Sequence, residues 1–182
     1  MSKLAFIFPG QGAQKAGMGK DFYENSEAAR SFFDQAQKIL DFDLKEMCFG
    51  EHEELNLTEY TQPCMVSVCL AIVQELKKRG INPDITAGLS LGEYAAVAAA
   101  GGMNELDAIK LVRRRGILMQ STVPAGEGAM AAVLGLDAKK IEEILESFEN
   151  VWIANYNCPG QIVITGLTNE VQQASLALKE AG

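Results

Sequence analysis

The sequence has 182 residues and a mass of 19.7 kDa, which corresponds to one domain or to one domain with part of another. Apolar residues make up 48% and charged residues 22%, which excludes a disordered or low-complexity chain. The net charge is -8 and the pI is about 4.7, which argues against nucleic acid as a partner. The longest apolar run, residues 94–100, is far shorter than the ~20 residues of a membrane-spanning helix, so no membrane association is expected.

The first residues and the cysteines indicate a reducing compartment. The run that follows Met1 is too short for the apolar segment of a signal peptide, so a cytoplasmic protein is expected. The four cysteines lack both CxxC pairs and the spacing of a zinc site. We therefore expect buried free thiols, no disulfide and no metal, at Cys48, Cys64, Cys69 and Cys158.

The first elements in chain order are a strand, a loop and two helices. Residues 3–8 form a short apolar run that Pro9 and Gly10 stop, which predicts a buried strand followed by a glycine-rich loop over 9–19. Helical spacing of apolar residues predicts a helix over 26–40. The acidic stretch 41–61 is expected to be irregular, and Pro63 is expected at the start of the next helix, which runs to residue 77.

A second strand and two more helices complete the first half. Residues 83–87 read as a strand that enters Gly88-Leu-Ser-Leu-Gly92, and residues 94–100 read as a helix ended by a glycine pair. Asn104 marks the start of another helix. A buried parallel sheet usually has ~4–6 strands, and this half supplies two.

The pattern changes after Pro124. Strands are predicted at 129–134, 151–156 and 161–166, with one helix capped by Asp137 and another that opens at Thr168. The order β-α-β-β-α lacks the last strand of a ferredoxin-like unit. We therefore expect an α/β protein with two modules, residues 1–123 and 124–182. Because both modules are interrupted, we also expect the sequence to be the N-terminal part of a longer protein.

The segment Gly88-x-Ser90-x-Gly92 lies between a strand and a helix, which is the context of a nucleophile elbow. The turn is so tight that a Cβ at either glycine would clash. The serine hydroxyl is expected at the N-terminus of the following helix, where the helix dipole and the N–H of Leu91 can stabilise an oxyanion. The pattern predicts a serine nucleophile at Ser90.

The loop after the first strand is not a phosphate-binding loop. Lys15 stands where the dinucleotide fingerprint needs a glycine, and the spacing before Gly19-Lys20 does not fit a Walker A motif. What remains is a flexible backbone that can offer N–H groups. In serine acyl-transfer folds such a loop often supplies the second oxyanion donor.

Arginines 113–115 give information about the charge of the substrate, and the single histidine is a candidate for the catalytic base. Three successive arginines on a helix cannot share a face, so two are expected in solvent and one packed inward. An inward guanidinium beside a nucleophile binds a carboxylate well, which suggests an anionic substrate. His52 lies in the acidic segment Glu51-His-Glu-Glu and is expected on the surface. A serine nucleophile needs a base, and no other histidine is present.

Six segments together resemble the malonyl-CoA:acyl carrier protein transacylase family, in the family's order and from end to end of the chain. They are Phe8-Pro-Gly-Gln-Gly-Ala-Gln, Thr61-Gln-Pro, Gly88-Leu-Ser-Leu-Gly-Glu-Tyr, Arg115-Gly-Ile-Leu-Met-Gln, Gly128-Ala-Met-Ala-Ala-Val and Asn155-Tyr-Asn-Cys-Pro-Gly-Gln-Ile-Val-Ile. The resemblance implies an α/β-hydrolase-like subdomain with a ferredoxin-like subdomain inserted into it, each incomplete here. In this family the catalytic histidine follows the inserted unit, and this sequence ends first.

The resemblance also implies the site. Ser90 is the acylated nucleophile, the backbone N–H groups of Gln11 and Leu91 form the oxyanion hole, Arg115 binds the malonyl carboxylate, and Gln161 belongs to the inserted subdomain's side of the cleft. Leu89 stands where many relatives carry a histidine, so the hydrogen bonding around the elbow is expected to differ from theirs while the reaction is the same. The implied partners are malonyl-CoA and acyl carrier protein, with no cofactor and no metal.

Two alternatives stay open at this stage. A serine thioesterase or esterase shares the elbow, but it gives the arginine no role. A non-catalytic fragment that binds the carrier protein or CoA is favoured by the absence of the histidine. Release of free malonate would favour the first, and binding without acylation of Ser90 would favour the second.

Overall fold

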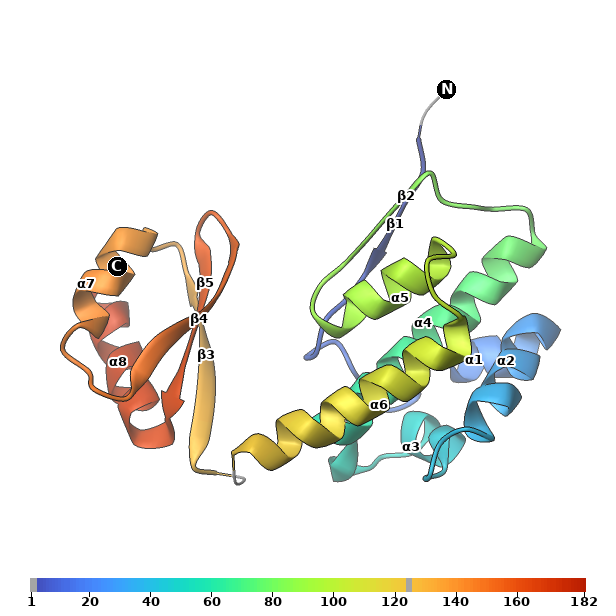
Figure 1. The fold of residues 1–182 in the computed structure, drawn as a ribbon, viewed down its shortest axis with the longest axis horizontal. Coiled ribbons are helices and arrows are strands. Elements are labelled where there is room, and N and C mark those ends of the chain that lie inside the picture. Colours follow the sequence, from blue (N-terminus) through green and yellow to red (C-terminus); the bar gives the residue numbers. More distant parts are fainter. Residues whose placement is uncertain (1–2, 124–125) are drawn as a thin grey trace. The chain divides into compact units, whose positions relative to one another are not determined.

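The computed structural model describes residues 3–123 and 126–182 (Figure 1). The chain divides into two compact units, a larger one that ends at Ser121 and a smaller one that begins at Thr122. The predicted boundary between residues 123 and 124 falls next to residues 124–125, which lie outside the described residues. Each unit has its own hydrophobic core.

The larger unit contains one parallel pair of strands and a set of helices. β1 (Ala5–Phe8) pairs with β2 (Ile85–Gly88), from Ala5 opposite Ile85 to Phe8 opposite Gly88, so both predicted strands are present with slightly different bounds. The prediction that the first strand is buried is wrong, because only Phe8 of its four residues is buried. The helices, in chain order, are α1 (Lys20–Asn25), α2 (Glu27–Gln37), α3 (Leu44–Phe49), the 3₁₀ helix η1 (Glu53–Asn56), α4 (Thr58–Lys78), α5 (Leu91–Ala99) and α6 (Glu105–Thr122).

Side-chain caps fix two of the predicted helix starts. Ser26 precedes α2, and its Oγ accepts a hydrogen bond from the N–H of Ala29 at 3.0 Å. Asn104 precedes α6, and its Oδ1 accepts from the N–H of Leu106 at 2.9 Å. Each cap satisfies an amide that the helix itself leaves without an acceptor, which is why these residue types begin helices.

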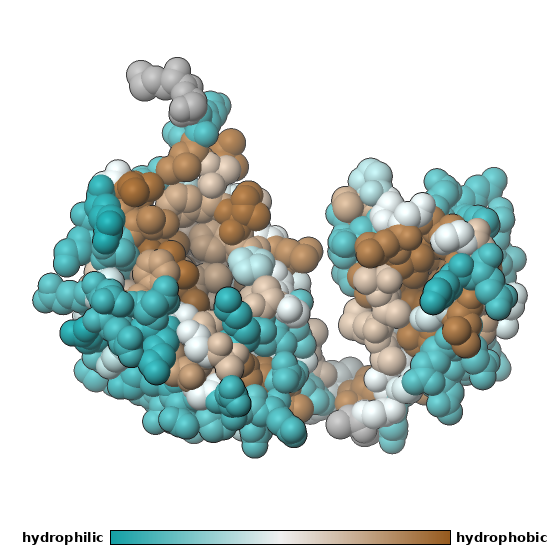
Figure 2. All heavy atoms as spheres, turned by 180° about the vertical axis from the view of Figure 1, so that it is seen from behind, coloured by the Kyte–Doolittle hydropathy of each residue, from teal (hydrophilic) through white to brown (hydrophobic). Residues whose placement is uncertain are grey.

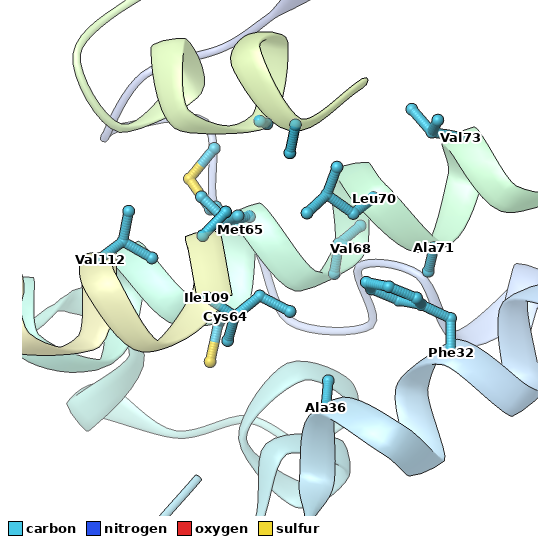
Figure 3. Close-up of a cluster of buried hydrophobic side chains, with 14 of the residues drawn as sticks. Phe32, Ala36, Cys64, Met65, Val68, Leu70, Ala71, Val73, Ile109 and Val112 are labelled. Carbon is cyan, nitrogen blue, oxygen red and sulfur yellow. The ribbon is translucent and has the colours of Figure 1, made fainter. Parts of the chain in front are cut away.

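Helix α4 lies at the centre of the core. Figure 3 shows its buried side chains between those of α2, among them Phe32 and Ala36, and those of α6, among them Ile109 and Val112. Leu70 of α4 is fully buried. Because each large apolar side chain contributes about 1.5–3 kcal/mol on full burial, the contact among these three helices stabilises the unit.

The predicted start of α4 is wrong. Pro63 is expected at the start of a helix, but α4 begins at Thr58 and runs through the proline. A proline inside a helix leaves the carbonyl four residues earlier without its amide donor. Here that carbonyl belongs to Glu59, and Arg113 Nη1 of α6 donates to it at 2.8 Å. A side chain from another helix therefore replaces the lost backbone hydrogen bond.

The prediction of an irregular segment over 41–61 is also wrong. The segment holds α3, η1 and the first turn of α4. Asp43 caps α3 by accepting from the N–H of Glu46 at 2.9 Å. These elements are too short to show a helical period, so only their caps mark them in the sequence.

The cysteines are free thiols, as expected, but they are not all buried. Cys48 and Cys64 are buried, Cys69 is half-buried and Cys158 is exposed. Burial raises the pKa of the Cys69 thiol to about 11. The pKa of Cys64 is also raised, by a hydrogen bond with Cys48 and by burial. High thiol pKa values keep both of these groups protonated and unreactive.

One face of the parallel pair is apolar and open. The Ile7 and Ile85 side chains, which point away from the core, are 71% and 54% exposed. An apolar groove of about 410 Å³ runs between β1 and α4, with Phe6 and Ile72 in its walls. Figure 2 shows apolar surface over this part of the larger unit, on the left of the view. Parallel strands are normally covered on both faces, so this surface is unusual for a parallel sheet.

The smaller unit is a three-stranded antiparallel sheet with two helices. β3 (Gly128–Leu134), β4 (Val151–Cys158) and β5 (Gln161–Leu167) lie in the order β3-β5-β4, and the helices are α7 (Ala138–Leu145) and α8 (Thr168–Ala181). The predicted order β-α-β-β-α is confirmed. The buried side chains of this unit include Ile141, Ile162 and Ile164, which join the sheet to the helices.

Candidate active site

The strand-turn-helix prediction around Ser90 is confirmed. Ser90 stands between β2 and α5 with φ 54° and ψ −110°, and it is the only non-glycine residue with positive φ in residues 3–123 and 126–182. Such a backbone conformation costs of order 1–3 kcal/mol and persists only where the surroundings enforce it. Ser90 is exposed at the start of α5, which is the position that the elbow pattern predicts for a nucleophile.

Two glycines allow this turn to exist. A Cβ on Gly88 would lie 2.1 Å from the carbonyl carbon and oxygen of Gly92, and a Cβ on Gly92 would lie 2.5 Å from the carbonyl oxygen of Phe8. Backbone atoms occupy both places and have no room to move. The elbow therefore packs directly on the end of β1, and both glycines are required by space rather than by flexibility.

The loop after β1 lies against the elbow. A Cβ on Gly10 would be 3.0 Å from the carbonyl oxygen of Leu89, and the Leu89 N–H donates to the Phe8 carbonyl at 3.1 Å. These contacts bring the segment that carries Gln11 next to the serine turn. The Gln11 side chain donates to Thr58 Oγ1 at 3.1 Å, which ties the loop to the first residue of α4. Leu89 is exposed, and its hydrocarbon side chain can form no hydrogen bond within the elbow.

The start of α5 offers partial positive charge to the serine. Leu91 is the first residue of the helix, so its N–H belongs to the group of amides that an α-helix leaves without an internal acceptor. The helix dipole points its positive end in the same direction. An oxygen that becomes negative next to Ser90 would be stabilised by both.

Arg115 brings a full positive charge to the same place. Its Nη2 donates to Ser90 Oγ at 3.1 Å, and its Nη1 donates to Gln62 Oε1 at 2.7 Å. The guanidinium carbon lies 5.7 Å from the centre of the Tyr94 ring, a distance at which a cation is attracted to the ring face. Both oxygen atoms that accept from Arg115 are neutral, and within residues 3–123 and 126–182 the guanidinium forms no ion pair, so the charge beside Ser90 Oγ is held in place without being neutralised.

The charge of the neighbouring Arg113, in contrast, is neutralised by two carboxylates. Arg113 donates to both carboxylate oxygens of Asp41 at 2.9 Å and to Glu59 Oε2 at 3.1 Å. Its side chain is 12% exposed and lies over the rings of Phe42 and Tyr60. Burial lowers the pKa of Arg113, but the bonds to Asp41 and Glu59 outweigh it and the pKa is raised. The hydrogen bond from Arg113 also lowers the pKa of Asp41.

This arrangement corrects one expectation about the three arginines. Two were expected in solvent, but only Arg114 is exposed, whereas Arg113 and Arg115 are both partly buried. The carboxylates that compensate Arg113 come from other segments of the chain. The helical spacing alone could not show which of the three arginines pairs with carboxylates.

The sequence did not single out Gln62 or Tyr94 as site residues. Gln62 is fully buried in α4, and Tyr94 lies in α5. A glutamine within an otherwise apolar helical run is a weak signal of a buried hydrogen bond. No spacing rule connects residue 62 to residue 115, so the contact could be found only in three dimensions.

Among the described residues, His52 is not a hydrogen-bond partner of Ser90. His52 lies before η1, and its Nε2 is 3.0 Å from Glu46 Oε1, a pair near the surface. Gln161 lies at the start of β5 in the smaller unit, where its Oε1 accepts from Asn157 Nδ2 at 3.3 Å. In the described part of the chain, no group of three metal-binding side chains occurs and no helix is long and apolar enough to cross a membrane.

The chain belongs to the acyl transferase domain family, whose model matches residues 5–182. Within that family it is similar to the malonyl CoA-acyl carrier protein transacylase of Bacillus subtilis (strain 168), with 48% identity over 100% of this chain and 59% of that protein. The corresponding Staphylococcus aureus (strain MSSA476) protein is 48% identical over 91% of this chain and 55% of its own length. The chain therefore spans somewhat more than half the length of these relatives.

Solved structures give the same result and confirm the fold class. The Clostridium perfringens malonyl CoA-acyl carrier protein transacylase matches with a TM-score of 0.89 and 43% identity, over 100% of this chain and 58% of that chain. The Coxiella burnetii transacylase matches with a TM-score of 0.92 and 39% identity, over 100% and 59%. A malonyl-transacylase solved in complex with a type II polyketide acyl-carrier protein matches with a TM-score of 0.91 and 39% identity, over 100% and 60%.

Proposed function

We propose that this chain carries the nucleophile and the acyl-binding arginine of a malonyltransferase of fatty-acid synthesis. The reaction moves malonyl from malonyl-CoA to the phosphopantetheine thiol of acyl carrier protein through a malonyl ester on Ser90. One observation carries the proposal: the Arg115 guanidinium lies 3.1 Å from Ser90 Oγ and is held by neutral groups. The family of the chain and its transacylase relatives support the same reaction.

Arg115 selects the acyl group by charge. In malonyl-CoA the carboxylate follows the thioester carbonyl after a single methylene, so an arginine that reaches the nucleophile also reaches the carboxylate. Guanidinium binds carboxylate through parallel N–H···O bonds, and each charged hydrogen bond contributes about 1.5–3 kcal/mol. A neutral acyl group would leave the buried part of this charge unpaired, so it is disfavoured.

The first half-reaction acylates the enzyme. Ser90 Oγ bonds to the thioester carbonyl carbon while its proton passes to a base, and the carbonyl oxygen becomes an oxyanion. The N–H groups of Leu91 and Gln11 stabilise this oxygen, with the dipole of α5 behind it. The C–S bond then breaks, the carbonyl re-forms, and CoA leaves as its thiol after it has taken up a proton.

The second half-reaction returns the serine. The phosphopantetheine thiol of acyl carrier protein loses its proton and bonds to the ester carbonyl carbon of malonyl-Ser90. The same oxyanion hole stabilises the intermediate, the C–O bond to Ser90 breaks, and Ser90 Oγ regains a proton. Malonyl leaves as the thioester of the carrier protein.

The base is not assigned to His52. That histidine pairs with Glu46, and the sequence holds no second histidine. The family resemblance assigns the proton to a histidine that follows the inserted subdomain, and it assigns Gln161 to the cleft side of that subdomain. Both remain part of the proposal, together with a cytoplasmic location and a reaction without metal or cofactor.

The two alternative functions explain the site less well. An esterase or thioesterase for neutral acyl groups has no use for an uncancelled guanidinium beside its nucleophile. A non-catalytic binding fragment gives no role to the strained backbone that presents the Ser90 hydroxyl. The malonyltransferase gives both features a role.

The test uses a hybrid enzyme in which residues 1–182 are joined to the part of the Bacillus subtilis relative that lies outside the match. Incubation with malonyl-CoA should add the mass of one malonyl group, and Ser90→Ala should abolish the addition. Added phosphopantetheinylated acyl carrier protein should remove the group and become malonylated. Release of free malonate as fast as transfer would establish the esterase instead, and binding of CoA without acylation would establish the binding fragment.

A further inference from the structure

Gln62 is a buried polar side chain that serves Arg115. It is 0% exposed, its Oε1 accepts from Arg115 Nη1 at 2.7 Å, and its Nε2 donates to Met119 Sδ at 3.2 Å. Because guanidinium only donates hydrogen bonds, the amide oxygen must face Arg115 and the amide nitrogen must face the thioether. A thioether is a weak acceptor, so the bond to Arg115 is the strong one and defines the function of this side chain.

The surroundings hold Gln62 at a fixed distance from α6. Gly116 follows Arg115, and a Cβ there would lie 2.8 Å from the Cα of Glu59, so the two helices touch backbone to backbone at this point. Arg113 adds the bond to the Glu59 carbonyl that Pro63 leaves free. The first turns of α4 are therefore fixed against α6 on both sides of Arg115, and Gln62 cannot follow the arginine if it moves.

The amide of Gln62 is also the right chemical group for this position. A carboxylate in its place would form an ion pair with Arg115 and neutralise its charge. Arg113 is neutralised in this way by the carboxylates of Asp41 and Glu59. An apolar side chain would leave the guanidinium with one side-chain hydrogen bond instead of two. Only a neutral acceptor orients the guanidinium and leaves its charge available to a carboxylate of the substrate.

We infer that Gln62 is the positioning residue for Arg115, and that its neutrality maintains the preference for an acyl group that carries a carboxylate. The inference rests on the proposed malonyl transfer, because the preference concerns that reaction. Gln62 acts through Arg115 and need not touch the reacting atoms. Its effect should therefore appear in the choice between malonyl and acetyl donors and not in the chemistry common to both.

The experiment compares Gln62→Met and Gln62→Glu in the hybrid enzyme, with kcat and KM measured for malonyl-CoA and for acetyl-CoA. Gln62→Met should raise KM for malonyl-CoA about 10-fold, which is the loss of one charged hydrogen bond, and change acetyl transfer little. Gln62→Glu should lower kcat/KM for malonyl-CoA about 100-fold, because the new carboxylate occupies the guanidinium and repels the substrate carboxylate. Acetyl transfer should fall much less.

Gln37→Met is the matched control. Gln37 is a half-buried amide that donates to the Phe42 carbonyl at 2.9 Å and accepts from the Leu44 N–H at 2.8 Å. Its replacement removes similar hydrogen bonds and should lower stability without changing the malonyl-to-acetyl ratio. An equal loss with both donors in the Gln62 variants, or a ratio that Gln62→Glu leaves unchanged, would overturn the inference.

A second readout separates this inference from the proposed function. The guanidinium ¹⁵N–H resonance of Arg115, assigned with Arg115→Lys, reports the fixed geometry without any turnover. Gln62→Met should shift and broaden it, and Gln37→Met should not. If the unsubstituted hybrid transfers no malonyl, the proposed function fails while this signal still decides whether Gln62 positions Arg115. If Gln62→Met leaves the position and width of the Arg115 resonance unchanged, the positioning role is refuted.

Discussion

Arg115→Ala is the substitution whose effect the structure defines most closely. It removes the charged group 3.1 Å from Ser90 Oγ and leaves the elbow backbone untouched. A malonyl carboxylate held by two charged hydrogen bonds gains about 3–6 kcal/mol. Because Arg115 is only half-buried, solvent screens part of this energy and the low end applies. About 3 kcal/mol corresponds to a loss of about 100-fold in kcat/KM for malonyl-CoA.

Acetyl transfer should respond in the opposite direction. A neutral acyl group gains nothing from the guanidinium and leaves it unpaired, so Arg115→Ala should keep or raise acetyl transfer within about threefold. The assay is transfer from each CoA thioester to acyl carrier protein by the hybrid enzyme. Arg114→Ala is the control, since it removes the same charge from an exposed neighbour on α6. Equal losses for the two donors in Arg115→Ala, or an equal loss in Arg114→Ala, would refute the role given to Arg115.

Three further predictions concern the chain, the elbow and a buried acid. The 182-residue chain alone should transfer malonyl about 10⁴-fold more slowly than the hybrid, because under the proposed function the base is a histidine other than His52; full turnover that Ser90→Ala abolishes would contradict this. Gly88→Ala should abolish acylation by forcing Gly92 away, while circular dichroism still shows the helices; an acylated variant would show that the elbow has room. Glu75 accepts from Ser26 Oγ at 2.5 Å, which lowers its pKa, so its contribution to stability is complete above the ordinary value of 4.5 and is lost as pH falls below it. Urea unfolding at about pH 7 and about pH 4 should show a smaller loss for Glu75→Gln than for the parent, and equal losses would contradict this.

The fold could be predicted where the spacing of apolar residues or a helix-capping residue marks a helix or strand. Helical spacing, short apolar runs and capping residues such as Asn104 and Asp137 predict the longer elements of the larger unit and the full element order of the smaller one. The start of α4 could not be predicted, because the rule that a proline begins a helix assumes that no other donor replaces the lost amide. Arg113 is that donor, and it lies 50 positions further along the chain from Pro63.

The site could be predicted where its parts are adjacent in sequence. The Ser90 elbow is a local pattern, and the structure gives it the strained backbone that the pattern implies. Arg115 was assigned only through the resemblance, because nothing local distinguishes it from Arg113. Gln62 was missed because its role depends on the contact between α4 and α6. The roles of Gln11, Leu91 and Gln161 stay predictions.

The pairing of β1 with β2 also determines when the elbow forms during folding. Leu4 and Asp84, which join the two strands at one end, are 80 residues apart, and closing a loop of that length costs about 4 kcal/mol of chain entropy. The helix contacts of α2 with α4 are closer in sequence, so they should form first. Gly92→Ala should then speed unfolding and leave the folding rate nearly unchanged, whereas Leu70→Ala should slow folding, both measured by stopped-flow fluorescence. If Gly92→Ala instead lowers the folding rate by as much as it lowers the stability, the elbow is already formed in the folding transition state. If the elbow forms late, the backbone strain at Ser90 arises after the folding barrier, so substitutions that tighten the elbow need not slow folding.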